Sequence, residues 1–373
     1  MGLVKDAFGK KLLGWYDENN RKLPWRETRD PYAILVSELM LQQTQVKTVI
    51  PYYHRFLDRF PTVEALAEAS EEDLLKMWQG LGYYRRARHL QAAARQIVEN
   101  HEAVFPSEKS EIDQLKGVGA YTSAAIASIA FNLPHACVDG NVIRVISRLS
   151  ASDEDVSLAK TKKNIQEVAQ QQLDLGRPGD FNQAMMELGA TVCTPRNPCC
   201  LTCPVNQFCE THQSGEDPHT RPLKSKKVVA SKVAYKCILL FSGQNLLLAR
   251  RPDTGLMAGM WELPAQHEEV FQPWEELFLE KPVFLGEAKP VSHKFTHLHA
   301  TYSVSVYQHA AELQWRTPPN AYAETRWVCQ DDFQRLPLTK VLTKLLPILT
   351  GFLKGEQTCQ KEPYALPGMQ TMN

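Results

Sequence analysis

The chain has 373 residues, of which 43% are hydrophobic and 23% charged, enough for two or three globular domains. Its 42 basic and 42 acidic residues cancel, and this balance counts against an ordinary basic nucleic-acid binder, so any DNA binding must depend on local patches. No run is long enough to span a membrane, and the N-terminus lacks the apolar core of a signal peptide. We therefore expect a cytoplasmic protein, associated with the nucleoid if it binds DNA.

The first part of the chain carries helical periodicity throughout. An amphipathic helix is predicted over 3–19, and Asp30-Pro31 supplies an N-cap and a first-turn proline for a helix over 31–45. Further helices are predicted over 51–60, 63–69, 71–77, 84–100, 110–115, 120–131, 141–150, 159–173 and 180–190. We see no strand signal or internal repeat here, so this part is predicted to be all-α.

Glu38 stands out within the helix predicted over 31–45. Its neighbours three and four positions away are Ile34, Leu35, Leu41 and Gln42, so its side chain leaves a largely apolar face. Poor solvation disfavours the charged form and raises a carboxyl pKa toward the range of a proton donor at neutral pH. The alternative is a glutamate satisfied by a structural hydrogen bond or an ion pair.

Two stretches are candidates for contacting a nucleic-acid backbone. Gly117-Val118-Gly119 separates two helical runs, and its glycines permit a tight turn that presents N–H groups at a helix start. The segment Tyr83 to Arg88 mixes aromatic and cationic side chains. The alternatives are an ordinary tight turn and a solvated helix face.

Asp139 lies between an extended Ala136-Cys137-Val138 and a helical run that starts at Asn141. Both flanking elements fix its carboxylate, which makes it a candidate catalytic anion. An aspartate before a helix is, however, more often an N-cap.

Cysteines crowd into one short segment. Cys193, Cys200, Cys203 and Cys209 give the spacing C-x6-C-x2-C-x5-C, which in a cytosolic chain indicates a structural metal, either tetrahedral zinc or an iron-sulfur cluster. Cys199 could replace Cys200 in this set.

The composition changes after the cysteines. Residues 213–230 are polar and basic and are predicted to be a linker. Beyond them, period-two alternation predicts strands over 233–241, 245–250 and 301–307, and helical patterns follow over 273–280 and 339–350. An α+β domain over 231–353 is expected, with a disordered tail over 354–373.

Several motifs in a fixed order carry a family resemblance. They are LPWR at 23, SELMLQQT at 37, GLGYYRRAR at 80, LKGVGAYT at 115, VDGNVIRV at 138, the cysteine spacing, and a weaker HKFTHLH at 293. Over roughly residues 8 to 350 the chain resembles adenine DNA glycosylases of the MutY type, in the helix-hairpin-helix superfamily that also includes endonuclease III.

The resemblance implies a multidomain fold: a two-lobed, all-α helix-hairpin-helix glycosylase domain with an iron-sulfur cluster loop, followed by an α+β Nudix-like domain. It assigns 1–27 with 134–212 to a lobe around a 4Fe-4S cluster, 28–133 to a six-helix barrel that carries the hairpin, and 231–353 to a recognition domain. Double-stranded DNA would lie between the lobes, bound by a monomer.

The family's reaction is hydrolysis of the N-glycosidic bond of adenine mispaired with 8-oxoguanine, with guanine as a second partner base, after the adenine is flipped out. By resemblance, Glu38 protonates the departing adenine and Asp139 stabilises the cationic sugar, a division of labour that suits two carboxyls in different environments. Tyr121 stands where endonuclease III-type enzymes carry a lysine nucleophile, which argues for hydrolysis without strand cleavage. Tyr121 and Asn141 are expected near Asp139.

Further contacts are implied by the same resemblance. The substrate-binding set is Gln43 and Tyr83 as wedges in the base stack, Trp25, Arg26, Leu41 and Glu187 in the adenine pocket, Gly117, Val118 and Gly119 in the hairpin, and Phe295, Thr296 and His297 in a loop that reads 8-oxoguanine. Family members commonly have serine where this chain has Thr296.

Gly259 to Pro264 resembles the start of a Nudix motif, but no Arg-Glu-x-x-x-Glu-Glu run follows, so we predict no pyrophosphatase activity. Two rival functions are an endonuclease III-like glycosylase for damaged pyrimidines or mismatched thymine, and a DNA-damage sensor without activity. Tyr121 and the Nudix-like domain argue against the first. The Glu38 and Asp139 pair argues against the second.

Overall fold

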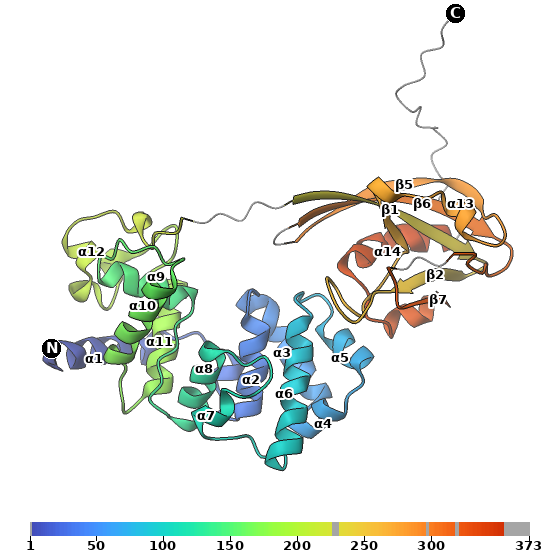
Figure 1. Cartoon of the computed structure of the whole chain (residues 1–373). Helices are drawn as coiled ribbons and strands as arrows, with labels where there is room; N and C mark the ends of the chain where they lie inside the picture. Colours follow the sequence, from blue (N-terminus) through green and yellow to red (C-terminus); the bar gives the residue numbers. More distant parts are fainter. Residues whose placement is uncertain (1, 226–230, 296–297, 318–320, 354–373) are drawn as a thin grey trace, which may run out of the picture. The chain divides into compact units, whose positions relative to one another are not determined.

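The computed structural model describes residues 2–225, 231–295, 298–317 and 321–353 (Figure 1). Its contacts separate two units, residues 1–70 with 85–227, and residues 71–84 with 228–373. The tail predicted over 354–373 lies outside the described residues. Within them, no helix combines the length and apolar character needed to cross a membrane.

The first unit is helical, as predicted. Its α-helices are α1 (Gly2–Asn19), α2 (Pro31–Leu41), α3 (Val46–Arg59), α4 (Val63–Glu68), α6 (Arg85–His101), α7 (Lys109–Ile112), α8 (Ala120–Phe131), α9 (Gly140–Leu149), α10 (Ala159–Gln172), α11 (Pro178–Thr191) and α12 (Glu210–Gln213). Short 3-10 turns are η1 (Pro24–Arg26), η2 (Cys200–Thr202), η3 (Asn206–Phe208) and η4 (Pro218–Thr220).

The helix predicted over 31–45 is shorter in the structure. It begins at the predicted proline, where Asp30 caps it by accepting the N–H of Tyr32, but it ends at Leu41. Gln43 has a φ of 60°, a left-handed conformation that an α-helix cannot continue, and α3 starts only at Val46.

Helices α2 and α8 form the centre of this unit. Every residue of α2 from Tyr32 to Met40 is buried, and α8 is buried from Thr122 to Ile129. Such helices are covered on all sides rather than on one stripe. Around them, α1, α9, α10 and α11 share a second core that includes Leu12, Val145 and Leu188.

The second unit contains a mixed sheet. Its strands are β1 (Ser231–Ser242), β2 (Asn245–Arg250), β3 (Trp261–Glu262), β4 (Ala265–His267), β5 (Val283–Lys294), β6 (Leu298–His309) and β7 (Glu324–Val328). The order is β3-β2-β1-β6-β5, with β4 on β1 and β7 on β2. β1 and β6 are parallel and paired over their full length, and the other pairs are antiparallel.

Helices and turns complete this unit. They are α5 (Glu71–Trp78), α13 (Trp274–Leu277), α14 (Lys340–Leu353), η5 (Glu268–Val270) and η6 (Gln330–Gln334). Residues of α14 pack with one face of the sheet, and Trp274 and Phe278 pack with the other. The predicted α+β class is confirmed, whereas the helix predicted over 273–280 is reduced to the four residues of α13.

Candidate functional site

One cavity of about 770 Å³ in the first unit gathers most of the predicted site residues. It is formed by η1, α2, the turn before α8, the start of α9 and one side of α11. Its lining includes Trp25, Arg26, Glu38, Leu41, Gln43, Gly117, Gly119, Tyr121, Asp139, Asn141 and Glu187. The two carboxyls predicted to act together, Glu38 and Asp139, therefore face the same space.

Glu38 projects from the buried helix α2 and is only 6% exposed. Burial raises its pKa to about 7, and the nearby charge of Asp139 acts in the same direction. A hydrogen bond with Tyr121 and the charge of Arg26 oppose this rise. A large fraction of Glu38 is thus protonated at neutral pH, as proton donation requires.

Asp139 is held by both of its carboxylate oxygens. As the N-cap of α9, it accepts the N–H of Val142 at Oδ1 (2.7 Å), and it accepts Nδ2 of Asn141 at Oδ2 (2.8 Å). The N-cap and the catalytic anion were alternative interpretations of the sequence, and the structure makes them compatible. The cap fixes the carboxylate at the cavity wall.

Asn141 is in turn oriented by Arg144. The guanidinium of Arg144 donates to Oδ1 of Asn141 (2.9 Å) and to the carbonyls of Gly189 (2.7 Å) and Cys193 (2.8 Å). Because this amide oxygen is occupied, Nδ2 of Asn141 points to Asp139. Helices α9 and α11 can approach this closely because Gly189 has no side chain. A Cβ at this position would lie 2.7 Å from the Cβ of Asn141.

The Tyr121 hydroxyl lies 3.1 Å from Sδ of Met186 and also forms a hydrogen bond with Glu38, and its single proton stabilises the Glu38 carboxylate when it is donated there. Burial and the charge of Glu38 raise the pKa of Tyr121, so the phenol stays neutral. No amine stands at this position, and the residue can donate a hydrogen bond but cannot form a Schiff base.

Glu187 is fully buried and has its carboxylate saturated by two arginines. Arg21 donates to both oxygens, from Nε and Nη2 (2.7 Å each), and Arg26 donates from Nη2 (2.8 Å). Burial alone would raise the pKa of Glu187, but the hydrogen bonds from Arg21 and Arg26 lower this pKa to about 2. Glu187 thus holds the two arginines at the cavity and stays ionised.

Gln183 and Arg21 line the cavity but were missed by the sequence analysis. Gln183 is 7% exposed and faces this cavity, and none of the hydrogen bonds between described residues involves its amide. Since buried amides are normally bonded, this side chain is available to a bound base. The available signal was its position one helical turn before Glu187.

The hairpin predicted at 117–119 depends on Gly117. This residue has a φ of +74°, and a Cβ there would lie 2.2 Å from the Cβ of His89. Gly119 is the N-cap of α8 and has open space around it. Val118 is buried and does not line the cavity.

Gly117→Ala is expected to lower the free energy of unfolding by more than about 2 kcal/mol, from left-handed strain and the overlap with His89. Gly119→Ala is the matched control and should cost less than about 1 kcal/mol. Urea denaturation measures both. Equal stability of the two variants would contradict the close approach of Gly117 to His89.

Two wedge candidates share an unusual backbone. Gln43 has a φ of 60° and Tyr83 a φ of 50°, and Tyr83 is 49% exposed. Gln43 lines the cavity, whereas Tyr83 belongs to the second unit. In that unit Phe295 packs edge-on against His293, while Thr296 and His297 lie outside the described residues. These roles remain predictions.

A separate cavity of about 320 Å³ lies within the cysteine loop. It is lined by Cys193, Cys199, Cys200, Cys203 and Cys209. Cys199 is exposed and the other four are half-buried, which supports Cys200 over Cys199 as a ligand. In the part of the chain that the structure describes, no three potential ligands converge on a single ion.

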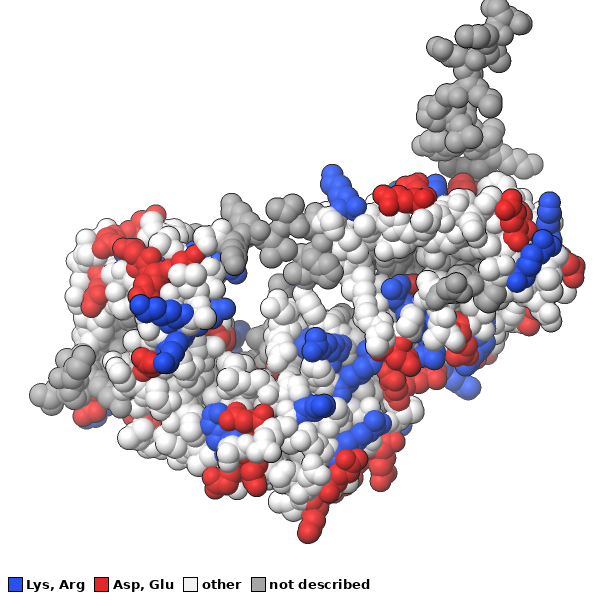
Figure 2. Space-filling view, viewed as in Figure 1, with Lys and Arg blue, Asp and Glu red and all other residues white. Residues whose placement is uncertain are grey.

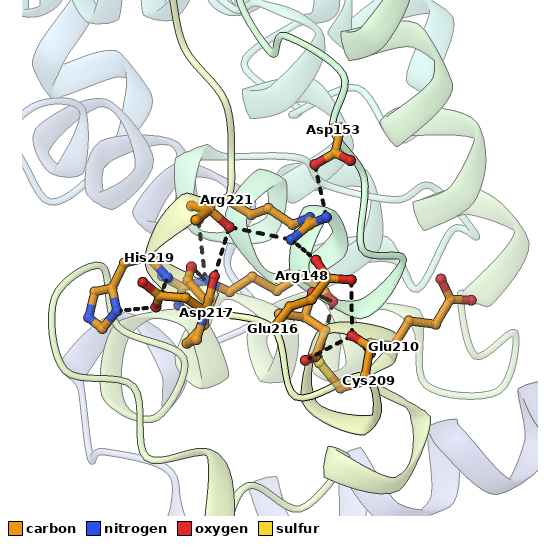
Figure 3. A network of polar contacts seen from close by, with 12 residues as sticks. Arg148, Asp153, Cys209, Glu210, Glu216, Asp217, His219 and Arg221 are labelled. Carbon is orange, nitrogen blue, oxygen red and sulfur yellow. Dashed lines mark hydrogen bonds and ion pairs between the residues drawn. The ribbon is translucent and has the colours of Figure 1, made fainter.

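Arg148 anchors the cysteine loop (Figure 3). Its Nη1 lies 3.3 Å from Sγ of Cys193, and its carbonyl accepts from Sγ of Cys209 (3.3 Å). Its Nε donates to the carbonyl of Pro218 (2.8 Å), and Arg221 pairs with Asp153 (2.8 Å). The first part of the predicted linker is therefore attached to this loop.

Charges of both signs are interspersed on the face shown in Figure 2, in keeping with the zero net charge.

A family model described as the HhH-GPD superfamily base excision DNA repair protein matches residues 36–172, and a NUDIX domain model matches residues 236–347.

Several known proteins are similar to this chain. Two adenine DNA glycosylases are each 36% identical, one from Rattus norvegicus over 96% of this chain and 80% of its own length, and one from Homo sapiens over 95% and 75%. A solved thermostable thymine-DNA glycosylase is 30% identical with a TM-score of 0.52, covering 56% of this chain and 97% of its own.

Proposed function

The chain belongs to the adenine DNA glycosylase family of base excision repair, and from that premise we propose that it hydrolyses the N-glycosidic bond of adenine opposite 8-oxoguanine or guanine in duplex DNA. The observation that carries the proposal is that Glu38 and Asp139 face one cavity, the former with a pKa of about 7. An extruded adenine nucleotide would enter this space.

The chemistry follows from the two carboxyl environments. Protonated Glu38 transfers its proton to a ring nitrogen of adenine, and the bond between base and sugar breaks as the base leaves neutral. Asp139, held by Val142 and Asn141, presents its negative charge to the cationic sugar. Water then adds to the sugar and gives up a proton to the Glu38 carboxylate, which restores the acid and leaves an abasic site.

The structure of Tyr121 supports hydrolysis without strand cleavage. Its neutral phenol hydrogen bonds with Glu38 and Met186, and it offers no amine to attack the sugar. The purified protein should leave the strand intact until alkali is added.

We propose that Cys193, Cys200, Cys203 and Cys209 bind a 4Fe-4S cluster. The half-buried sulfurs around one cavity fit such a group, which supplies cross-links between distant parts of the loop. The C-terminal domain is proposed to read the partner base through Phe295, Thr296 and His297. Iron and acid-labile sulfide in the purified protein, lost in Cys203→Ser, test the cluster.

The pH dependence of adenine release is expected to report Glu38. The active form is protonated, so kcat/KM should be steady well below pH 7 and fall about tenfold per unit above it. Tyr121→Phe removes a hydrogen bond that lowers the pKa of Glu38, so its descending limb should move to higher pH. If the descending limb of the pH profile stays at the same pH in Tyr121→Phe, the hydrogen bond between Tyr121 and Glu38 is contradicted.

Duplexes with adenine opposite 8-oxoguanine, guanine, cytosine or thymine test the function most directly. Free adenine should be released from the first two. Release of thymine or of a damaged pyrimidine would instead support the endonuclease III-like alternative, and tight binding without base release would support a damage sensor.

A further inference from the structure

The second unit contains a cavity of about 650 Å³ that the proposed glycosylase reaction does not use. Its lining comes from β1, β3, β4, β6 and the segments that follow β2, β4 and β6, and it includes Tyr235, Arg251, Glu262, Tyr302 and Tyr322. Glu262 lies in the Gly259–Pro264 stretch that resembles the start of a Nudix motif.

One wall of this cavity is aromatic. Tyr235 and Tyr302 lie opposite each other in the parallel β1–β6 pair, with ring centroids 5.3 Å apart and planes inclined by 15°. His267 packs edge-on against Tyr235, at 5.5 Å. Such a wall suits a flat heteroaromatic ring, which packs against aromatic side chains with little sequence preference.

A buried carboxylate lies beside that wall. Glu262 is 5% exposed, and its Oε1 accepts Nη1 of Arg251 (2.6 Å) and the hydroxyl of Tyr322 (3.1 Å). The hydroxyl of Tyr322 itself accepts the N–H of Ala265 (2.9 Å), so this network fixes one oxygen of the carboxylate. A fixed orientation of the carboxylate results.

Two polar atoms in the same place have no hydrogen-bond partner among the described residues. They are Oε2 of Glu262, whose two bonds both end on Oε1, and the hydroxyl of Tyr302, and these residues are 5% and 6% exposed. Since buried polar atoms are normally paired, two unpaired ones in one cavity indicate a missing polar ligand.

We propose that this cavity binds a free guanine-type nucleoside, with the base against the tyrosine wall and its N–H edge donating to Glu262. Guanine carries neighbouring N1–H and N2–H donors, which match a carboxylate. Adenine has an acceptor, N1, beside its single amino donor, and the lone pair of N1 would repel a carboxylate oxygen.

The charge of the lining favours a nucleoside over a nucleotide. Among the described lining residues, the cationic candidates are Arg251 and His267, and Arg251 is already paired with Glu262. A phosphate would find no uncommitted guanidinium or ammonium there. The ligand is therefore bound, without hydrolysis, as an uncharged molecule.

Isothermal titration of the full chain with guanosine, adenosine and cytidine tests this site. Guanosine should bind at least about tenfold more tightly than adenosine, a difference of one or two hydrogen bonds to a charged group. Tyr302→Phe removes only the unpaired hydroxyl and should weaken guanosine about threefold to tenfold. Glu262→Gln should weaken guanosine binding more than Tyr302→Phe does. Because this substitution also removes the buried ion pair with Arg251, thermal unfolding of the variant is measured to show that it remains folded.

Tyr307→Phe is the matched control, because Tyr307 lies on β6 but bonds with Glu275 outside this cavity. It should leave guanosine affinity unchanged. Undetectable guanosine binding, equal adenosine binding, or equal affinities in Tyr302→Phe and the unaltered protein would each overturn the proposal. A short guanine-containing single strand that competes as well as guanosine would show that the ligand is a base within nucleic acid instead.

Discussion

Replacing Glu38 by glutamine should lower the single-turnover rate of adenine release by about 10³-fold or more, while the affinity for the mispaired duplex stays nearly the same. The amide matches the carboxyl in size within the buried helix α2 but has no acidic proton to transfer. Rapid-quench measurement of free adenine and a gel-shift measurement of duplex binding separate the two quantities.

Ser37→Ala provides a control on the same helix. Ser37 lines the same cavity, and its hydroxyl donates to the carbonyl of Ile34 (2.8 Å), so its loss should change the rate by less than about tenfold. A wild-type rate in Glu38→Gln would remove Glu38 from the mechanism.

Asp139→Asn should lower the same rate by about 10²-fold to 10³-fold because the sugar cation loses its fixed anion. Asparagine caps helices as well as aspartate and can still accept the N–H of Val142. Its amide group would, however, face Nδ2 of Asn141, another donor that Arg144 holds in place, so stability should fall by about 1–2 kcal/mol.

Chemical denaturation and single-turnover kinetics on the same Asp139→Asn preparation distinguish the outcomes. A stable protein with slow base release supports a catalytic anion. An unstable protein whose remaining folded fraction releases adenine at the normal rate would mean that Asp139 serves only as a helix cap.

Local patterns were sufficient for the helical part of the fold. Asp30-Pro31 marks the start of α2, and the apolar neighbours of Glu38 indicate a buried carboxyl, because both signals lie within one or two helical turns. The end of α2 was not predictable in this way. Gln43 adopts a positive φ although nothing in its residue type requires it.

The sheet was predicted less completely. β1, β2 and β6 bury enough residues to show alternation or an apolar run, whereas β3 and β4 are only two and three residues long. β5 is mostly exposed and carries register shifts, which removes the alternation that identifies a half-buried strand.

Contacts between distant positions account for what was missed in the site. Arg21 meets Glu187 across 166 residues of sequence, and no spacing rule connects them. The orientation of Asn141 by Arg144 is close in sequence, yet its importance depends on the carbonyl of Gly189 from another helix. Motif order thus located the carboxyls but did not reveal what holds them.

The close packing of Gly189 against Asn141 makes the cavity sensitive to any substitution at position 189. Any larger residue at 189 must push α9 and α11 apart or rotate the Asn141 amide, and either movement shifts Asp139 by way of its hydrogen bond. A genetic screen for loss of repair should therefore recover substitutions at position 189 whose products still recognise damaged duplexes.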